Sequence, residues 1–447
     1  MKYKLFLYQC IRSREVLLSL ALLIALGLLG IFIGNRHLNE RQDAIEEVKT
    51  YQEEHFERHV SLHNDDLGLL LYYVKFAFIN PADPLAGLSI GQSDVNPSIK
   101  RITIKTFEAQ KHDTDLINPM NLQSGNLDFS FVLIYLVPLL VIVFSFNAVS
   151  EETETGTWRL VATQTRSKLG FVITKLSVRL LLIVGVLIFL FLAAKVVFNI
   201  PFNSVFLVMF ILSVLYTIFW FTLCFFIICF KKSSGFNALM LLSIWLVLLI
   251  LLPAGINAYL AFKYPVPEAL GTAIAQRDGY HTKWDMEKLP TIQKFYDHYP
   301  QFEKYGYPTE GFNWLWYYAM QQMGDDDSRN ERESLNSKIQ LRERHSAQFA
   351  SWLPNMHLQL ALNQLAGTSL GQHIDFLEAT EKFHERLRLF FYPKIFEENL
   401  AESINWERFP PEYYRENFDI RPLRLMAPLI LAILFMVLIS APRGRRL

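Results

Sequence analysis

Residues 205–230 read VFLVMFILSVLYTIFWFTLCFFIICF and contain no charged side chain. A helix that crosses a lipid bilayer needs about 20 mostly apolar residues, because it must satisfy every backbone amide internally across a hydrocarbon core about 30 Å thick. The run from Val205 to Phe230 meets that requirement. The composition agrees, since 51% of the 447 residues are hydrophobic and only 19% are charged, unlike the balance in soluble domains. The sequence therefore predicts a membrane protein.

Further apolar runs have the length of membrane spans. With Val205 to Phe230 they make six expected transmembrane helices, the others being Val16 to Gly34, Phe129 to Val149, Leu176 to Phe198, Ala238 to Leu260 and Leu425 to Ala441. The first run is not a cleaved leader, because its apolar part is too long and no small-residue cleavage pattern follows it. We predict an all-α integral membrane protein.

Basic residues gather at every second connection between these runs. They are Lys2, Lys4, Arg12, Arg14, then Arg159, Arg166, Lys168, Lys175, then Lys231, Lys232, and finally Arg443, Arg445, Arg446. Lys and Arg near span ends stay on the cytoplasmic side. The pattern predicts that both termini are cytoplasmic and that two large regions lie outside the membrane.

The chain then divides into five expected segments. They are 1–34 with the first span, 35–128 as the first outer region, 129–260 with spans two to five and a cytoplasmic loop at 150–175, 261–422 as the second outer region, and 423–447 with the last span and a basic tail. Both outer insertions are expected to be mainly helical. The first should open with a helical stalk from His37 to about Val60 and contain a short strand within 100–106, and the second should be helical from Arg329 to about Asn399.

The expected cytoplasmic loop reads SEETETGTWRL from Ser150 to Leu160 and reaches Lys175 at the next span. It resembles the signature of ABC-2 permeases, the membrane subunits of a class of bacterial ABC transporters. The matching residues are Glu154, Gly156, Thr157, Arg159, Leu160, Gln164, Ser167 and Lys175, and the departures are Trp158, Lys168 and Thr174. A glycine permits a tight turn, and acidic residues ahead of a helix favour its positive end. The residues expected to couple the chain to an ATPase are Glu152, Glu154, Gly156, Thr157, Arg159, Arg166, Lys168 and Lys175.

Three further blocks resemble one subfamily of these permeases, which carries a large domain of unknown function between the fifth and sixth spans. They are PLAGLSIGQSDVNP at 84–97, NPMNLQSG at 118–125 and ALNQLAGT at 361–368. The resemblance implies a permease of the bacterial plasma (inner) membrane that pairs with a second permease, same or different, and with separate ATP-binding subunits. It implies an exporter or an envelope-acting mechanotransmission complex. The second outer region is large enough to bind a periplasmic partner.

The sequence has no G-x-x-x-x-G-K-[ST] loop, which ATP hydrolysis needs to hold phosphates. We therefore expect no enzyme activity and no cofactor in this chain, with ATP and Mg²⁺ bound by the partner. Lys and Arg balance Asp and Glu at 43 each, which gives no basic footprint for nucleic acid. The alternative is a non-transporting membrane scaffold or sensor with an outer partner-binding domain. An integral-membrane enzyme is a third reading that no catalytic set supports.

Several single features allow two readings. Gly30 and Gly34 form a G-x-x-x-G that could join two protomers or occur by chance. Pro138, Pro253 and Pro428 could mark hinges or static kinks. We expect no metal site, because no H-x-x-x-H pair occurs among the outer histidines considered, His281, His298, His345, His357, His373 and His384.

Two outer motifs are expected to be structural. Asp325-Asp326-Asp327 should form a turn and cap the helix that follows, with calcium binding as the weaker reading. Phe390, Phe391 and Tyr392 should pack the core of the second outer region.

Overall fold

The computed structural model of the chain describes residues 2–111, 127–165, 167–265, 284–308, 310–415 and 421–444. Among these residues, six helical stretches are long and apolar enough to cross a membrane. They are α2 (Arg14–Leu62), α6–η2–α7–α8 (Phe129–Glu154), α10 (Lys168–Val197), α11 (Ser204–Ile228), α12–η3–α13 (Ser234–Lys263) and α20 (Pro422–Gly444). The predicted all-α membrane fold with six spans is confirmed.

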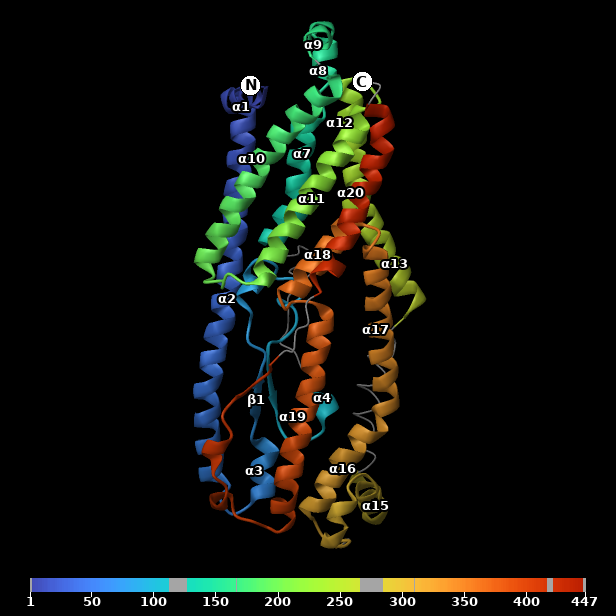
Figure 1. Ribbon diagram of the computed structural model, residues 1–447. Coiled ribbons are helices and arrows are strands. Elements are labelled where there is room, and N and C mark those ends of the chain that lie inside the picture. The colour runs from blue at the N-terminus through green and yellow to red at the C-terminus, as the bar shows by residue number, and fades with distance from the viewer. Residues whose placement is uncertain are drawn as a thin grey trace.

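The spans form a bundle at one end of an elongated molecule, and the two regions expected outside the membrane lie at the other end (Figure 1). We call this second part the distal domain. The terminal helix α1 (Lys2–Arg12), the loop helices α8 (Ser150–Glu154) and α9 (Trp158–Gln164) and the C-terminus all lie at the opposite end, the loop end. The predicted stalk is confirmed, because α2 continues without a break from the bundle along the distal domain.

Two of the spans contain a π-helical turn directly before a proline. The turn η2 covers Val132–Leu136 before Pro138, and η3 covers Val247–Leu251 before Pro253. A proline has no N–H to donate to the carbonyl four residues earlier, and π-helical turns are one way in which a helix accommodates such a gap. The sequence allowed a hinge or a static kink at these prolines, and the structure places a π-helical turn before each of these two.

Side chains from neighbouring elements donate to backbone carbonyls within these turns. The Tyr216 hydroxyl donates to the carbonyl of Ile134 at 3.0 Å, four residues before Pro138. Trp245 Nε1 donates to the carbonyl of Tyr135 at 3.2 Å. Asn355 Nδ2 donates to the carbonyl of Leu248 at 2.8 Å. An unsatisfied backbone group in lipid costs several kcal/mol, so these donors make the interrupted helices tolerable.

The two outer regions join into one domain. A three-stranded sheet in the order β2-β1-β3 is built from β1 (Phe76–Ile79), β2 (Ile99–Ile102) and β3 (Glu412–Tyr413). β1 is antiparallel to β2 and parallel to β3. The first outer region therefore meets the end of the second outer region in this sheet. The strand expected within 100–106 therefore exists but begins at Ile99, and the other two strands were not predicted.

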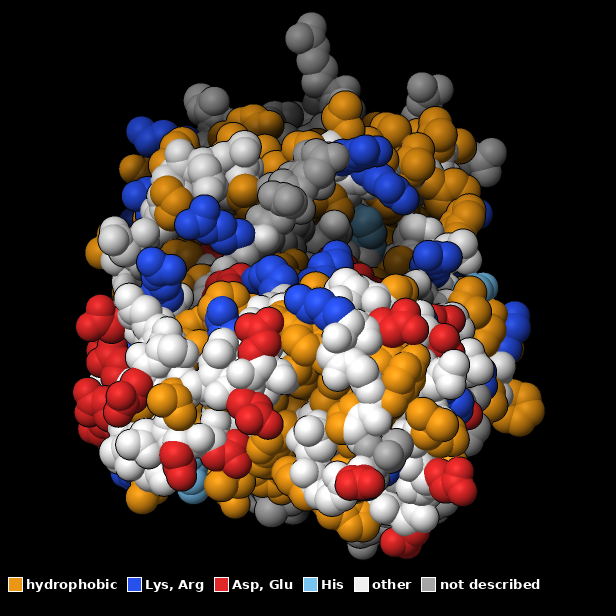
Figure 2. Space-filling view, turned by 90° about the horizontal axis from the view of Figure 1, so that it is seen from below, with side chains coloured by type: hydrophobic (Ala, Val, Ile, Leu, Met, Phe, Trp, Pro, Cys, Tyr) orange, Lys and Arg blue, Asp and Glu red, His pale blue; other side chains and the backbone are white. Residues whose placement is uncertain are grey.

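The other described elements of the two outer regions are helical. They are α3 (Leu67–Tyr73), η1 (Pro84–Gly87), α4 (Phe107–Lys111), α15 (Lys288–His298), η4 (Pro300–Tyr305), α16 (Trp314–Asp327), α17 (Arg329–Ala350), α18 (Pro354–Leu365), α19 (Leu370–Phe396), η5 (Ala401–Ser403) and η6 (Trp406–Arg408). The expected helical stretch from Arg329 to Asn399 corresponds to α17, α18 and α19. Seen from its far end, the molecule carries Lys and Arg side chains across the middle and upper part of the view and Asp and Glu mainly in its lower half (Figure 2).

The distal core is aromatic and contains a buried ion pair. Phe391 and Tyr392 are fully buried, as predicted, but Phe390 is 44% exposed, so that part of the prediction is wrong. Arg388 on α19 pairs with Asp325 on α16 at 2.8 Å. Asp325 also accepts the backbone N–H of Phe107 at 2.9 Å.

The prediction for Asp325-Asp326-Asp327 is corrected by this arrangement. These residues form the last turn of α16, and the residue that precedes α17 is Ser328. The reason is that the Asp325 carboxylate is drawn into the core by Arg388 and by the N–H groups at the start of α4. A turn that exposed the carboxylate would leave the guanidinium buried without its partner, which is strongly destabilising.

Helix α18 belongs to the second outer region but packs into the bundle. Leu358, Ala361 and Leu362 are part of the bundle's hydrophobic core. At its start, Asn355 reaches η3, and the His357 ring lies 2.6 Å from the carbonyl of Leu425 near the start of α20. Helix α18 is therefore a part of the distal domain that packs directly against the membrane helices.

Candidate coupling site

The loop predicted to couple the chain to an ATPase projects from the loop end of the bundle as two short helices (Figure 1). Helix α8 ends at Glu154 and α9 begins at Trp158, and Gly156 between them has φ +75°. L-residues with a side chain rarely adopt this backbone conformation, whereas glycine adopts it freely. No atom lies within 4 Å of a Cβ added at Gly156, so the requirement is conformational rather than steric.

Lys175 lies in the wall of the bundle beneath this loop. Its side chain is only 3% exposed, and its Nζ donates to the carbonyl of Ala148 at 3.1 Å. It also pairs with Glu152 Oε1 at 3.3 Å. The other carboxylate oxygen of Glu152 accepts the hydroxyl of Thr157 at 2.6 Å. Three of the predicted residues are therefore brought together, and they tie the loop to α10.

Glu154 ties the loop to a second span. Its carboxylate accepts the backbone N–H of Ser234 at 2.7 Å and the Ser234 hydroxyl at 2.9 Å. The hydroxyls of Ser234 and Ser150 are 2.7 Å apart. Ser234 is the first residue of α12, where free N–H groups and the helix dipole favour a carboxylate.

Ser150 and Ser234 are site residues that the sequence reasoning missed. The pair Ser233-Ser234 before an apolar run has the pattern of a helix N-cap. That signal indicates where a helix starts but not which side chain contacts it. Glu154 and Ser234 are 80 positions apart in the chain, so only the folded structure shows that they are hydrogen-bonded.

The remaining predicted residues face outward or lie outside the described residues. Helix α9, which carries Arg159, has no buried residue, and its Leu160 is 60% exposed. Lys168 begins α10 and is also exposed. Arg166 lies outside the described residues. The loop thus combines a side held by α10 and α12 with a free surface that carries an arginine and an apolar side chain.

The carbonyl end of α7 (Val137–Ser145) is capped from the same two spans. Lys175 donates to Ala148, Asn237 Nδ2 donates to the carbonyl of Phe146 at 3.1 Å, and the Arg179 guanidinium donates to the carbonyl of Phe144. Cations are favoured at a helix C-terminus, where the last carbonyls have no helical donor. Lys175 therefore has a structural role as well as its contact with the loop.

Gly30 and Gly34, for which a protomer interface was one of two readings, approach another segment of the same chain. A Cβ at Gly30 would lie 2.9 Å from the backbone of Asp128 and Phe129, where α6 begins. A Cβ at Gly34 would lie 1.9 Å from the carbonyl oxygen of Gly87. The glycines do permit a close approach, but the partner is the backbone of the same chain.

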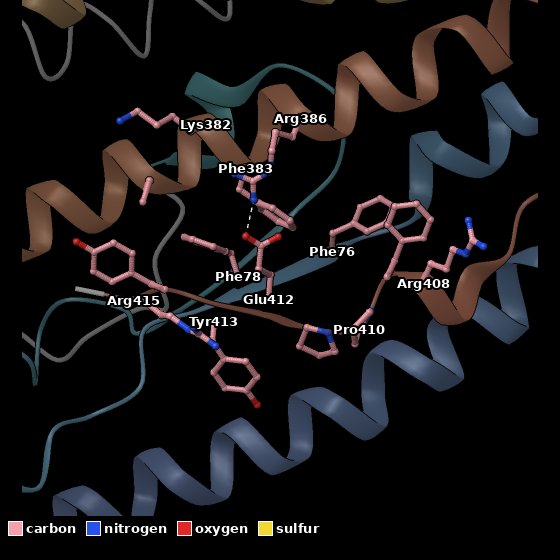
Figure 3. A pocket seen from close by; sticks show the side chains of 14 residues that line it. Phe76, Phe78, Lys382, Phe383, Arg386, Arg408, Pro410, Glu412, Tyr413 and Arg415 are labelled. Atoms are coloured by element: carbon pink, nitrogen blue, oxygen red, sulfur yellow. Dashed lines mark hydrogen bonds and ion pairs between the residues drawn. The ribbon is translucent and has the colours of Figure 1, made fainter. Parts of the chain in front are cut away.

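The distal domain contains a groove of about 690 Å³ between α19 and the segment 408–415 (Figure 3). Phe76, Phe78 and Phe383 line its floor, and the Arg386 guanidinium is paired with the Glu412 carboxylate across it. This groove is set by the β1–β3 pairing, and no feature of the sequence indicated it.

The described residues contain no group of three or more His, Cys, Asp or Glu that could hold a metal ion. The sequence does contain one H-x-x-x-H-x-x-x-H series, at His55, His59 and His63 on α2, which is not among the histidines considered above. In the structure the His59 ring stacks on His63 and on Tyr73, and His55 meets His59 edge to face. His55 Nε2 lies 3.2 Å from the carbonyl of Tyr73. The series is therefore part of an aromatic stack.

Two family models match the chain. One is described as an ABC-2 family transporter protein and matches residues 5–324, and the other is described as a domain of unknown function (DUF3526) and matches residues 270–415. No curated protein and no solved structure matches significantly. The first match covers well over half of the chain and includes five of the six spans and the loop. The chain therefore belongs to the ABC-2 family and is a permease subunit of an ABC transporter, with a domain of unknown function between its fifth and sixth spans.

Proposed function

We propose that this permease is driven by a separate ATP-binding subunit that docks on α8 and α9 at the cytoplasmic face of the bacterial inner membrane. The observation that carries the proposal is the double attachment of this loop, through Glu152 to Lys175 on α10 and through Glu154 to Ser234 on α12. A displacement of the loop by a docked subunit would move both spans. ATP and Mg²⁺ bind on the partner, and this chain supplies the mechanical link.

A second permease subunit completes the proposed transporter. In one copy, only 11% of the apolar window is buried in each of the spans α12–η3–α13 and α20. These two surfaces are available to lipid and to a partner permease, which supports a homo- or heterodimer. The complex acts as an exporter or as an envelope-acting mechanotransmission machine, with the distal domain placed to bind a periplasmic partner.

The experiment is co-purification of the tagged full chain with its ATPase, followed by measurement of ATPase turnover in lipid. Gly156→Trp places a bulky side chain at a positive-φ turn on the free surface and should abolish co-purification. Glu154→Ala should keep the ATPase bound but lower its turnover several-fold, because α8 is released from α12.

Glu151→Ala is the matched control. Glu151 is an exposed carboxylate of the same short helix, and among the described residues its side chain accepts a hydrogen bond from Asn147, one turn earlier, at 3.0 Å. This variant should retain both binding and turnover. Wild-type co-purification and turnover in Gly156→Trp and Glu154→Ala would refute docking and coupling at this loop.

A further inference from the structure

A cavity of about 850 Å³ lies where the distal domain meets the bundle, between α17, α18 and the first turns of α20. Its apolar side is formed by Leu360 and Ala361 of α18 and by Leu425 and Pro428 of α20. Ala361 is part of the bundle's hydrophobic core. One side of the cavity therefore continues the apolar surface of the membrane-spanning helices.

The ends of the adjacent spans place this cavity at the expected edge of the membrane on the distal-domain side. The spans that end or begin near the distal domain carry very exposed apolar residues there, with Phe262 at 87% and Leu423 at 82%. Such side chains are stable at the boundary between headgroups and hydrocarbon, where aromatic and apolar residues anchor a span. Leu423 precedes the cavity residues Arg424 and Leu425 directly in the chain.

The polar side of the cavity is strongly basic. Arg344 of α17 and Arg421 and Arg424 at the start of α20 line it, and none of the described residues that line it is a carboxylate. Among the described residues, neither Arg344 nor Arg424 forms a salt bridge, and both side chains are exposed. Guanidinium groups bind phosphate and carboxylate in a bidentate fashion.

Uncharged polar groups complete the lining. They are the side chains of Gln348, Ser351 and Gln364, with His357 beside them. The His357 ring lies 2.6 Å from the carbonyl of Leu425, and burial lowers its pKa below the usual 6.5. At neutral pH it is therefore a neutral donor to that carbonyl, and the positive charge of the cavity comes from the three arginines.

We infer that this cavity binds an anionic amphiphile from the membrane leaflet on the distal-domain side, with a phosphate on the arginines and an apolar tail along Leu425 and Pro428. A basic side and an apolar side meet in one cavity at the membrane edge, and an amphiphile matches both. A free phosphate would match only the basic side. The site lies at the opposite end of the bundle from α8 and α9, so it goes beyond the proposed docking of an ATPase.

The test is native mass spectrometry of the full chain in detergent, titrated separately with dioleoyl phosphatidylglycerol, dioleoyl phosphatidylcholine and inorganic phosphate. The wild type should bind phosphatidylglycerol in preference to the other two. Arg344→Gln combined with Arg424→Gln should weaken this binding at least about tenfold, which corresponds to the loss of one or two charge-assisted hydrogen bonds. Leu360→Trp should fill the apolar side and weaken phosphatidylglycerol binding as well.

Arg408→Gln combined with Arg415→Gln is the matched control, because it removes the same charge from exposed arginines that line the distal groove instead. This variant should bind phosphatidylglycerol as the wild type does. Equal losses in the two double variants would mean general charge attraction and would overturn the site. Phosphate binding as tight as lipid binding would overturn the amphiphile. Neither result depends on ATP hydrolysis, so a failure here is distinct from a failure of the coupling proposal.

Discussion

Backbone carbonyls at the loop end of the bundle and deeper in the spans are capped by different kinds of side chain. At the loop end, the free carbonyls after α7 are capped by the cations Lys175 and Arg179 and by Asn237. Deeper in the spans, carbonyls of the two π-helical turns are capped by Tyr216, Trp245 and Asn355. Two of the three donors at the loop end are cations, whereas the three donors within the spans are neutral.

The difference follows from the cost of burying charge. A cation at the end of a span can reach water or a carboxylate, as Lys175 reaches Glu152. A cation deeper in the bilayer costs about 2.5 to 3.5 kcal/mol on insertion scales, more than a neutral hydroxyl or indole. The two groups of caps also differ in what they can do. The charged caps at the loop end can interact with a docking partner, whereas the neutral caps within the spans only hold helices together.

Lys175→Met should have the largest effect on this arrangement. It leaves the Ala148 carbonyl and the Glu152 carboxylate without their partner, and we expect a loss of about 3 kcal/mol in the free energy of unfolding. The measurement is thermal unfolding of the full chain in detergent, together with turnover of the co-purified ATPase. Lys175→Arg keeps the charge and should recover most of the stability. An unchanged Tm in Lys175→Met would mean that the cap contributes nothing.

Tyr216→Phe tests the neutral caps and should have a smaller effect. It removes the donor to the Ile134 carbonyl without changing the shape of a fully buried ring, and we expect a loss of about 1 to 2 kcal/mol. Tyr135→Phe is the control, because the Tyr135 hydroxyl makes no hydrogen bond among the described residues and the ring is only half-buried. The two variants should differ in Tm by several degrees, and equal values would show that the carbonyl finds another donor.

Much of the membrane half was predictable from the sequence, because each span is a local property of about 20 consecutive apolar residues. The position of Gly156 at a turn was also predictable, because it depends on the local sequence alone. The contacts of Glu154 with Ser234 and of Asp325 with Arg388 were not, since each joins residues more than 60 positions apart. The pairing of β1 with β3 and the insertion of α18 into the bundle likewise depend on distant partners.

The smallest expected effect is a pH dependence of stability. It should arise from a buried histidine of the distal domain and not from the neutral caps of the bundle. His384 is buried there, with a ring nitrogen 2.8 Å from the carbonyl of Lys105. Burial and the nearby Arg388 guanidinium lower the pKa of His384 well below 6.5. The unfolded chain therefore binds a proton that the folded chain does not, and stability present above pH 6.5 is lost as the pH falls below it.

His384→Gln keeps a donor for the Lys105 carbonyl and removes the titrating group. The wild type should lose up to about 1.4 kcal/mol for each pH unit below 6.5 from this residue, and the variant should lose that much less. The measurement is the Tm of both proteins at pH 7.5 and pH 5.5. Tyr216→Phe should shift the Tm equally at both pH values, because neither the hydroxyl nor the carbonyl it serves titrates in this range. If His384→Gln and wild type show the same pH dependence, the buried imidazole is not the group that makes the distal domain acid-sensitive.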